Sequence, residues 1–191
     1  MGREQKGDVS ITQWQLRITN AWTLGATELT RGQPRGTALL VADTGRGGAA
    51  EPVARLLAAG QRVVVLDPFY FGEARPATHD YLWALTLAAV GERSLGLQAS
   101  QVDAVARWLQ AERPNETVTL CSAGPRSSVV ALVAAALEPS TVAGCDLRGE
   151  FASLKAVITE NHAFNDMPEL FCFGLLRDFD MEQLKALART H

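Results

Sequence analysis

Two nearly continuous apolar runs, each ending in an aspartate, constrain the fold of this chain most strongly. TALLVAD covers residues 37–43 and RVVVLD covers residues 62–67. The intervening AAEPVARLLAAG has the apolar spacing of a helix and ends at Gly60. Strands without polar alternation are buried on both faces, and a strand–helix–strand unit joins parallel strands. The segment therefore predicts a parallel sheet with helices on both faces.

The strand–helix period recurs further along the chain. ETVTLCS (116–122) and TVAGCDL (141–147) are predicted strands, and PRSSVVALVAAAL between them is a predicted helix with Pro125 at its first position. SQVDAVARWLQAER predicts a helix from Ser100, which stands in capping-box spacing with Asp103. The carboxyl ends of parallel strands meet at one edge of a sheet, and we expect four side chains there: Asp43, Asp67, Ser122 and Asp146.

The two ends of the chain differ from this pattern. Apolar and polar residues alternate over residues 9–30, which predicts two antiparallel strands joined by a hairpin near Thr19 and Asn20. Residues 151–162, 168–179 and 180–188 are predicted helices, the last opening on a capping box of Asp180 and Gln183. An antiparallel start followed by strand–helix alternation predicts a three-layer α/β fold, mostly parallel, in one domain over residues 1–191, with residues 1–8 disordered.

Composition excludes several classes of function. The chain has 191 residues and a formal net charge of −3, without a long basic run, so nucleic acid is not an expected partner. The N-terminus lacks the apolar region of a signal peptide, and no apolar run is long enough to cross a bilayer. The three cysteines, Cys121, Cys145 and Cys172, lack metal-ligand spacing. We expect free thiols, a cytoplasmic location, no membrane contact and no metal.

A glycine-rich loop leaves a nucleotide-binding alternative open. Gly45-x-Gly47-x-x-Ala50 follows the first apolar strand, and Asp67 stands where a ribose-binding acid would lie. An NAD(P)-dependent oxidoreductase of the short-chain class also needs a Tyr-x-x-x-Lys pair, and the sequence contains none. We therefore expect no cofactor.

Longer segments carry a resemblance to a known family. They are VADTGRGG, LDPFYFGEA, GERSLGLQASQVDAVARWL, GPRSSVVALVAAALEP, FASLKAVI and MPELFCFGLLRDFDMEQLKAL, and the resemblance that they carry covers about residues 36–188. Through them the chain resembles the α/β-hydrolase superfamily, and within it domains related to acetyl xylan esterases and dienelactone hydrolases. In that family the chain would continue after residue 188 into the strand that carries the catalytic acid, so the resemblance implies that the C-terminal strand or strands are missing.

The resemblance implies roles for three loops. The loop after the first apolar strand would form the oxyanion hole with the turn after 116–122, through residues Thr44, Gly45, Gly47, Gly48, Ala123 and Gly124. The aromatic stretch after the second strand would line the acyl side of the cleft, through Phe69, Tyr70 and Phe71.

The nucleophile motif G-x-S-x-G of this superfamily does not occur in the sequence. Pro125 fixes the helix start and places the elbow at Gly124, which carries no nucleophile. Ser122, two residues earlier, is the candidate nucleophile, and Cys121 is a second, less favoured candidate. In the alternative interpretation, Ser122 and Ser127 are turn and helix-cap residues without a catalytic role. Candidate bases and acids are His79, His162, His191, Asp146 and Glu150.

Two functions remain open from the sequence. The first is a serine esterase acting on small acyl esters such as acetylated sugars, with Ser122 as nucleophile and a histidine as base. The second is a non-catalytic relative that serves for binding or as a scaffold. Because an uncovered sheet edge recruits other chains, we also expect self-association through an apolar patch formed by Leu184, Leu187 and residues 168–176.

Overall fold

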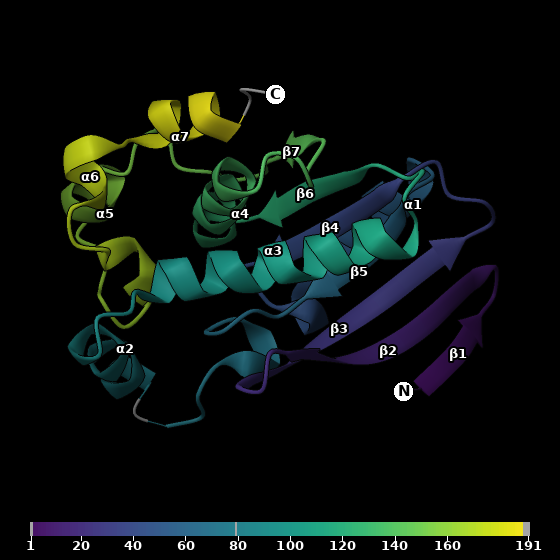
Figure 1. Ribbon diagram of the computed structural model, residues 1–191, viewed down its shortest axis with the longest axis horizontal. Coiled ribbons are helices and arrows are strands. Elements are labelled where there is room, and N and C mark those ends of the chain that lie inside the picture. The colour runs from purple at the N-terminus through teal and green to yellow at the C-terminus, as the bar shows by residue number, and fades with distance from the viewer. Residues whose placement is uncertain (1, 79, 189–191) are drawn as a thin grey trace.

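A twisted mixed sheet lies at the centre of the molecule, seen in a computed structural model that describes residues 2–78 and 80–188 (Figure 1). Within these residues the sheet has seven strands in the order β1-β2-β3-β5-β4-β6-β7. Strands β5, β4, β6 and β7 run parallel, whereas β1, β2 and β3 attach antiparallel on one side. The strands are β1 (Gly2–Lys6), β2 (Val9–Ile18), β3 (Trp22–Arg31), β4 (Thr37–Ala42), β5 (Arg62–Leu66), β6 (Val118–Ala123) and β7 (Gly144–Asp146).

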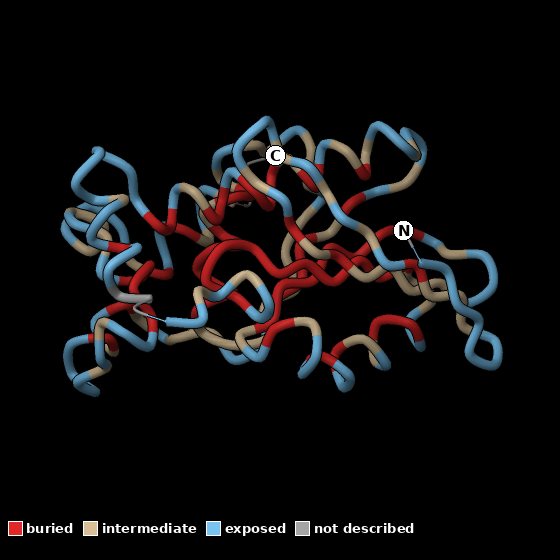
Figure 2. The backbone as a smooth tube through the Cα atoms, turned by 90° about the horizontal axis from the view of Figure 1, so that it is seen from below, coloured by how far each residue is buried: buried red, intermediate tan, exposed pale blue. Residues whose placement is uncertain are grey.

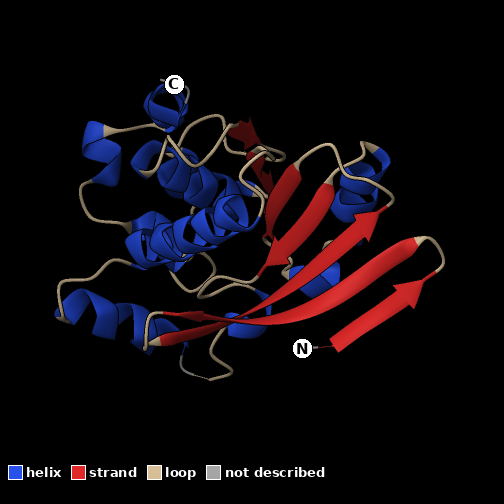
Figure 3. Ribbon diagram, turned by 45° about the vertical axis from the view of Figure 1, so that its right-hand side comes forward, coloured by secondary structure: helices blue, strands red, loops and turns tan. Residues whose placement is uncertain are grey.

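Alternate residues of the central strands feed two separate cores. Leu39 and Val41 of β4 face the long helices α3 (Ser94–Glu112) and α4 (Pro125–Leu137), which α7 (Met181–Ala188) joins. Leu40 of β4 faces the opposite side, where it packs with α1 (Ala50–Ala58). The buried backbone follows the strands through the middle of the molecule (Figure 2), and the helices flank the sheet on both sides (Figure 3). The predicted three-layer α/β fold is confirmed.

The loops after the parallel strands gather at one end of the molecule with the shorter helices (Figure 1). The parallel pairings place the carboxyl ends of β4, β5, β6 and β7 at one edge, as predicted for Asp43, Asp67, Ser122 and Asp146. The shorter elements are η1 (Arg46–Gly48), η2 (Gly72–Ala74), α2 (Asp80–Ala89), α5 (Ala156–Thr159), η3 (Pro168–Phe171) and α6 (Leu175–Asp178).

Local signals gave several boundaries correctly. The hairpin joins β2 to β3 through Thr19, whose φ of 54° lies in the left-handed region. Helix α4 begins at Pro125 as expected. At the start of α7, Asp180 donates its N–H to Oε1 of Gln183 at 3.0 Å, which is one half of the predicted capping box, and its carboxylate accepts the N–H of Met181 at 2.8 Å.

Other boundaries were wrong, for identifiable reasons. Residues 2–6 are not disordered: β1 pairs along β2 from Gly2 opposite Gln13. Helix α3 begins at Ser94, and the Ser100 hydroxyl donates to the carbonyl of Leu97 inside the helix instead of capping it. The predicted helices over 151–162 and 168–179 are reduced to single turns, and the second is interrupted at Gly174, whose φ is 85°.

Candidate functional site

The turn between β6 and α4 has the backbone shape of a nucleophile elbow, with a glycine at its tip. Gly124 has φ 123° and ψ 165° and immediately precedes α4. This conformation is strained for any residue with a side chain. A Cβ atom at this position would lie 2.3 Å from Cγ of Asp43, at the end of β4. The elbow therefore has neither a nucleophile nor the space for one.

The carboxylate of Asp43 occupies the start of α4. It accepts the N–H of Arg126 at 3.1 Å and the N–H of Ser127 at 2.8 Å. A carboxylate at this place caps the helix and interacts favourably with its dipole. In an α/β-hydrolase the residue after the nucleophile supplies an oxyanion N–H, and that residue here is Pro125, which has none.

Three of the six amides assigned to the oxyanion hole donate hydrogen bonds within the protein. Gly45 donates to the carbonyl of Ala42 at 2.9 Å, and Gly48 donates to the carbonyl of Gly45 at 3.2 Å. At the elbow, Gly124 donates to the carbonyl of Arg148 at 2.8 Å. Of the remaining residues, Thr44 and Gly47 are exposed in the same loop, and Ala123 ends β6 in register with Ala42.

Asp67 organises the loop that follows β4. Its carboxylate is buried and accepts the N–H of Arg46 at 2.8 Å, the Nε of Arg46 at 3.1 Å and the N–H of Glu73 at 3.1 Å. Gly72 packs against this carboxylate so closely that a Cβ there would lie 2.3 Å from it. Asp67 is the acid that the nucleotide-binding alternative assigned to a ribose. Its carboxylate instead accepts hydrogen bonds from Arg46 and Glu73 of the same protein.

The three aromatics after β5 lie in the interior. Phe69, Tyr70 and Phe71 are 5%, 3% and 0% exposed, so they belong to the core and do not line an open cleft. The backbone of this stretch is fixed by α3: Phe69 donates its N–H to Oε1 of Gln101 at 2.8 Å, and Gln98 donates to the carbonyl of Phe69 at 2.9 Å.

A buried ion pair lies next to these aromatics. Arg126, two residues after the elbow, makes two hydrogen bonds to the carboxylate of Glu169 in η3, and the one from its terminal nitrogen measures 3.2 Å. Its guanidinium also lies 4.5 Å from the ring centroid of Phe71 and donates to the carbonyl of Tyr70 at 3.3 Å. Sequence reasoning missed this pair. The available signal was a single acid, Glu169, in the otherwise apolar stretch PELFCF.

Ser122 is fully buried behind the elbow. Its hydroxyl shares a hydrogen bond of 2.9 Å with that of Ser128, which also donates to the carbonyl of Gly124 at 2.7 Å. The neighbouring Cys121 is also buried, and burial raises the pKa of its thiol to about 12, so the thiol is protonated near neutral pH.

The candidate bases and acids have other partners or lie outside the described residues. His162 contacts Glu160, with Nε2 3.1 Å from the carboxylate, and its ring packs on Phe151. Asp146 accepts from Arg55 at 2.8 Å and Arg148 at 2.9 Å; burial opposes its ionisation, but these two bonds hold its pKa below the usual range. Glu150 pairs with Lys185 at 3.1 Å. His79 and His191 lie outside the described residues.

Two further properties concern the described part of the chain alone. Within residues 2–78 and 80–188, no group of three or more histidine, cysteine, aspartate or glutamate side chains is arranged to hold a metal ion. Over the same residues, none of the helices combines the length and apolarity needed to cross a bilayer.

Comparison with known proteins rests on structure, because no family model and no curated protein matches the sequence. A candidate acetyl xylan esterase from Bacteroides fragilis aligns with a TM-score of 0.64 at 13% identity, covering 76% of this chain and 46% of that one. A cold-adapted esterase from an Arctic intertidal metagenomic library gives 0.57 at 14% identity, covering 83% and 68%. Dienelactone hydrolase from Anabaena variabilis gives 0.51 at 19% identity, covering 72% and 63%.

These likenesses concern the fold, since every identity is below one in five. The chain spans about half the length of the first of these proteins. The strand order, the elbow between β6 and α4 and the structural neighbours agree with one another, and together they show an α/β-hydrolase-like fold.

Proposed function

We propose that this chain is a non-catalytic protein of the α/β-hydrolase fold, which serves as a binding or scaffolding domain. The observation that carries the proposal is the position of the Asp43 carboxylate against Gly124 and the first amides of α4. Ester hydrolysis passes through an oxyanion, which needs hydrogen-bond donors at the elbow. Here a fixed negative charge already accepts those donors, so a second negative charge would be repelled.

The interior around the elbow supports the same proposal. The ion pair of Arg126 with Glu169 and the ring of Phe71 fill the space beside the helix start. A buried, hydrogen-bonded ion pair of this kind orders the loops that carry it, since leaving either charge unpaired is costly. The strand-end region thus has a structural role in holding α4, η3 and the loop after β5 together.

A serine esterase is the second candidate, favoured by the fold that the chain shares with known esterases. In that case Ser122 would attack a small acyl ester such as an acetylated sugar. It would first have to leave its hydrogen bond to Ser128 and become accessible from solvent, because its side chain is fully buried.

Turnover of p-nitrophenyl acetate separates the two candidates. We expect wild type and Ser122→Ala to hydrolyse the ester at the same rate as heat-inactivated protein. Ser140→Ala serves as the matched control, because Ser140 is exposed and distant in sequence from the elbow. A parallel incubation with a fluorophosphonate is expected to leave the intact mass of the wild type unchanged.

The opposite result is equally specific. A wild-type rate above background that disappears in Ser122→Ala but persists in Ser140→Ala, with a fluorophosphonate adduct on Ser122, would establish the esterase and overturn the non-catalytic proposal.

A further inference from the structure

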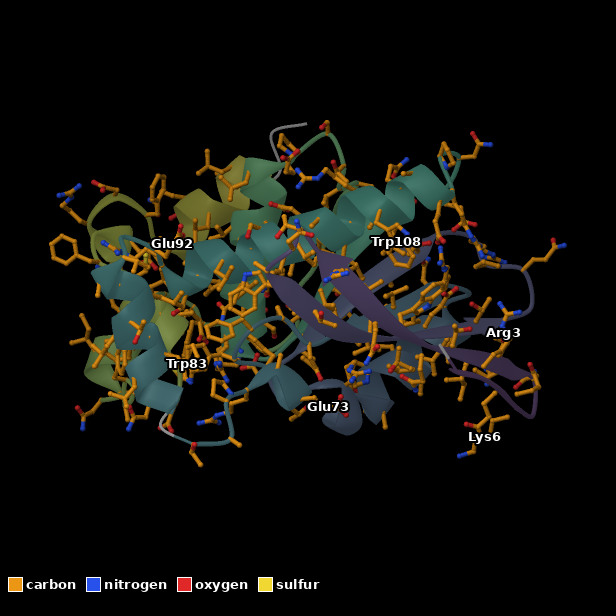
Figure 4. The ribbon with its side chains drawn as sticks, turned by 60° about the horizontal axis from the view of Figure 1, so that its bottom comes forward. Arg3, Lys6, Glu73, Trp83, Glu92 and Trp108 are labelled. Carbon is orange, nitrogen blue, oxygen red and sulfur yellow. The ribbon has the colours of Figure 1, made fainter. Side chains whose placement is uncertain are left out.

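Large apolar side chains are exposed at the end of the molecule where the parallel strands have their carboxyl ends. Helix α2 and the segment from α5 to α6 form this end of the molecule (Figure 1), and Trp83 and Glu92 mark it in Figure 4, opposite the end with Arg3 and Lys6. We define the end patch as five residues with the exposed fractions Leu82 45%, Leu85 55%, Ile158 71%, Phe171 42% and Phe173 88%.

Three residues of the end patch, Leu85, Phe171 and Ile158, line two adjoining grooves. Leu85 of α2 and Phe171 of η3 line one groove together. Phe171 and Ile158 line a second groove of about 200 Å³, whose other walls come from Leu170, Leu175 and Leu176. Because Phe171 lines both grooves, they adjoin and connect α2 with α5.

The composition of α2 indicates that this surface is covered by a partner. Its sequence, DYLWALTLAA, is apolar around nearly the whole helix, whereas Ala84 and Leu87 are the members of its described side chains that pack into the aromatic cluster beneath it. Helices that are apolar on all sides are normally buried on all sides. Large exposed apolar patches mark interaction sites.

We propose that the end patch is the two-fold interface of a homodimer, in which Phe173 of each subunit fills the second groove of the other. Phe173 projects as the most exposed large apolar side chain described, just before Gly174, whose φ is 85°. The groove that would receive it is apolar and large enough for one aromatic ring. A two-fold interface needs a self-complementary surface, and a projecting ring beside a groove meets this requirement.

The exposed area agrees with a stable dimer. Taking about 200 Å² for a large apolar side chain, the five exposures amount to roughly 600 Å² per subunit. A standard interface buries about 800 Å² per partner, of which about 65% is apolar in homodimers. The end patch thus supplies roughly the apolar area of one such interface.

The charges around the end patch favour a second copy over an anionic membrane. Glu92 and Arg93 border the first groove, and the ion pair of Arg177 with Asp178 follows the residues that line the second. A rim with both signs of charge can pair with itself across a two-fold axis. Binding to an anionic lipid surface instead requires an excess of basic residues, and the chain carries a net charge of −3.

The self-association predicted from sequence was placed on Leu184, Leu187 and residues 168–176. Leu184 is only 4% exposed and packs in the main core, so it cannot belong to an interface. Leu187 is 45% exposed but lies on α7, outside the end patch. Phe171 and Phe173 remain from the predicted segment, and Leu82 and Leu85 of α2 with Ile158 of α5 complete the end patch.

Sedimentation velocity over a wide concentration range tests the proposal. Wild type is expected to approach twice the 20.6 kDa mass of one chain as concentration rises. Phe173→Lys and Leu85→Lys should each raise the dissociation constant by about thirtyfold or more, the effect of removing a central interface side chain. Both side chains are exposed, so the thermal midpoint of the monomer should be unchanged. Leu137→Lys is the matched control, because Leu137 is 60% exposed at the end of α4 and outside the end patch.

Three results would overturn the dimer. They are a concentration-independent monomer mass for the wild type, equal weakening by Leu137→Lys, and a monomer that binds phosphatidylcholine vesicles through the end patch. None of these experiments measures ester hydrolysis, so they test the dimer independently of the proposed lack of catalysis.

Discussion

Gly124 packs directly against the carboxylate of Asp43. A Cβ atom at position 124 would lie 2.3 Å from Cγ of Asp43, so only glycine fits there. The same carboxylate caps α4. Backbone conformation, packing and capping at the elbow therefore depend on one pair of residues, and a side chain at position 124 would disturb all three.

Gly124→Ser is expected to lower the free energy of unfolding by about 1–3 kcal/mol, because the new side chain would be strained at a φ of 123° and would displace Asp43. Urea denaturation measures the loss. Gly47→Ser is the control, since a Cβ there would meet nothing within 4 Å.

Asp43→Ala should weaken the cap of α4 by about 1 kcal/mol. The double variant that combines Gly124→Ser with Asp43→Ala should lose less stability than the sum of the two single losses. Additive losses would show that the two positions do not interact.

Arg126→Met and Glu169→Met are each expected to destabilise the protein by about 3–5 kcal/mol, because each leaves the partner's charge buried and unpaired. The double variant should recover a large part of this loss, since two apolar side chains of similar length can fill the same volume. Urea midpoints of the four proteins form the test. A double variant that is less stable than either single variant would contradict the pairing.

Asp103 gives the stability a predictable dependence on pH. Burial, with the charge of Glu138 added, raises the pKa of Asp103 from 3.8 to about 7, although Arg107 opposes the shift. The folded state therefore holds this proton more tightly than the unfolded state. The resulting stability is complete below pH 3.8 and is lost as the pH rises to about 7.

Asp103→Asn should remove this dependence. From the size of the shift, the wild type loses on the order of 4 kcal/mol between the two limits, and the variant should be the more stable protein at pH 8. Thermal midpoints from pH 5 to pH 8 measure the difference. Asp166→Asn, at an exposed position, should leave the wild-type slope in place. A wild-type thermal midpoint that stays constant from pH 5 to pH 8 would contradict the predicted role of Asp103.

Titration with NAD or NADP is expected to leave the thermal midpoint unchanged. The acid that could hold a ribose, Asp67, is buried and already accepts hydrogen bonds from Arg46 and Glu73. A ligand that binds the folded state raises its midpoint in a saturable way. Such a rise with either nucleotide would show that the loop after β4 can open and would restore the oxidoreductase interpretation.

Most of the fold could be predicted from the sequence, because its signals are local. The unbroken apolar runs of β4 and β5 indicate burial on both faces, and Pro125 fixes the first turn of α4. The single turns α5 and η3 could not be predicted in this way. Residues 151–162 contain helix-forming residues, but contacts with distant segments compete with the local signals: Asp180, just before α7, accepts the N–H of Leu154 at 2.6 Å, and η3 packs against α3.

The candidate site was less predictable, because it depends on contacts between distant segments. The sequence places Gly124 at the elbow, yet the partner that closes it, Asp43, comes from another strand end 81 residues earlier. The aromatics at 69–71 appear next to charged residues in the sequence, which suggested a cleft. Their burial depends on Gln98 and Gln101 of α3, which satisfy the backbone of Phe69 and let the stretch enter the core.

The elbow has a consequence for any attempt to evolve hydrolysis in this protein. A reactive elbow needs a side chain at 124, an N–H at 125 and an unoccupied helix start, and here glycine, proline and the Asp43 carboxylate remove one requirement each. A single substitution restores at most one of them, so selection acting on one change at a time would find no gain in rate to retain. Under the proposed non-catalytic function, hydrolysis at the elbow would have to be sought in libraries in which positions 43, 124 and 125 are replaced together.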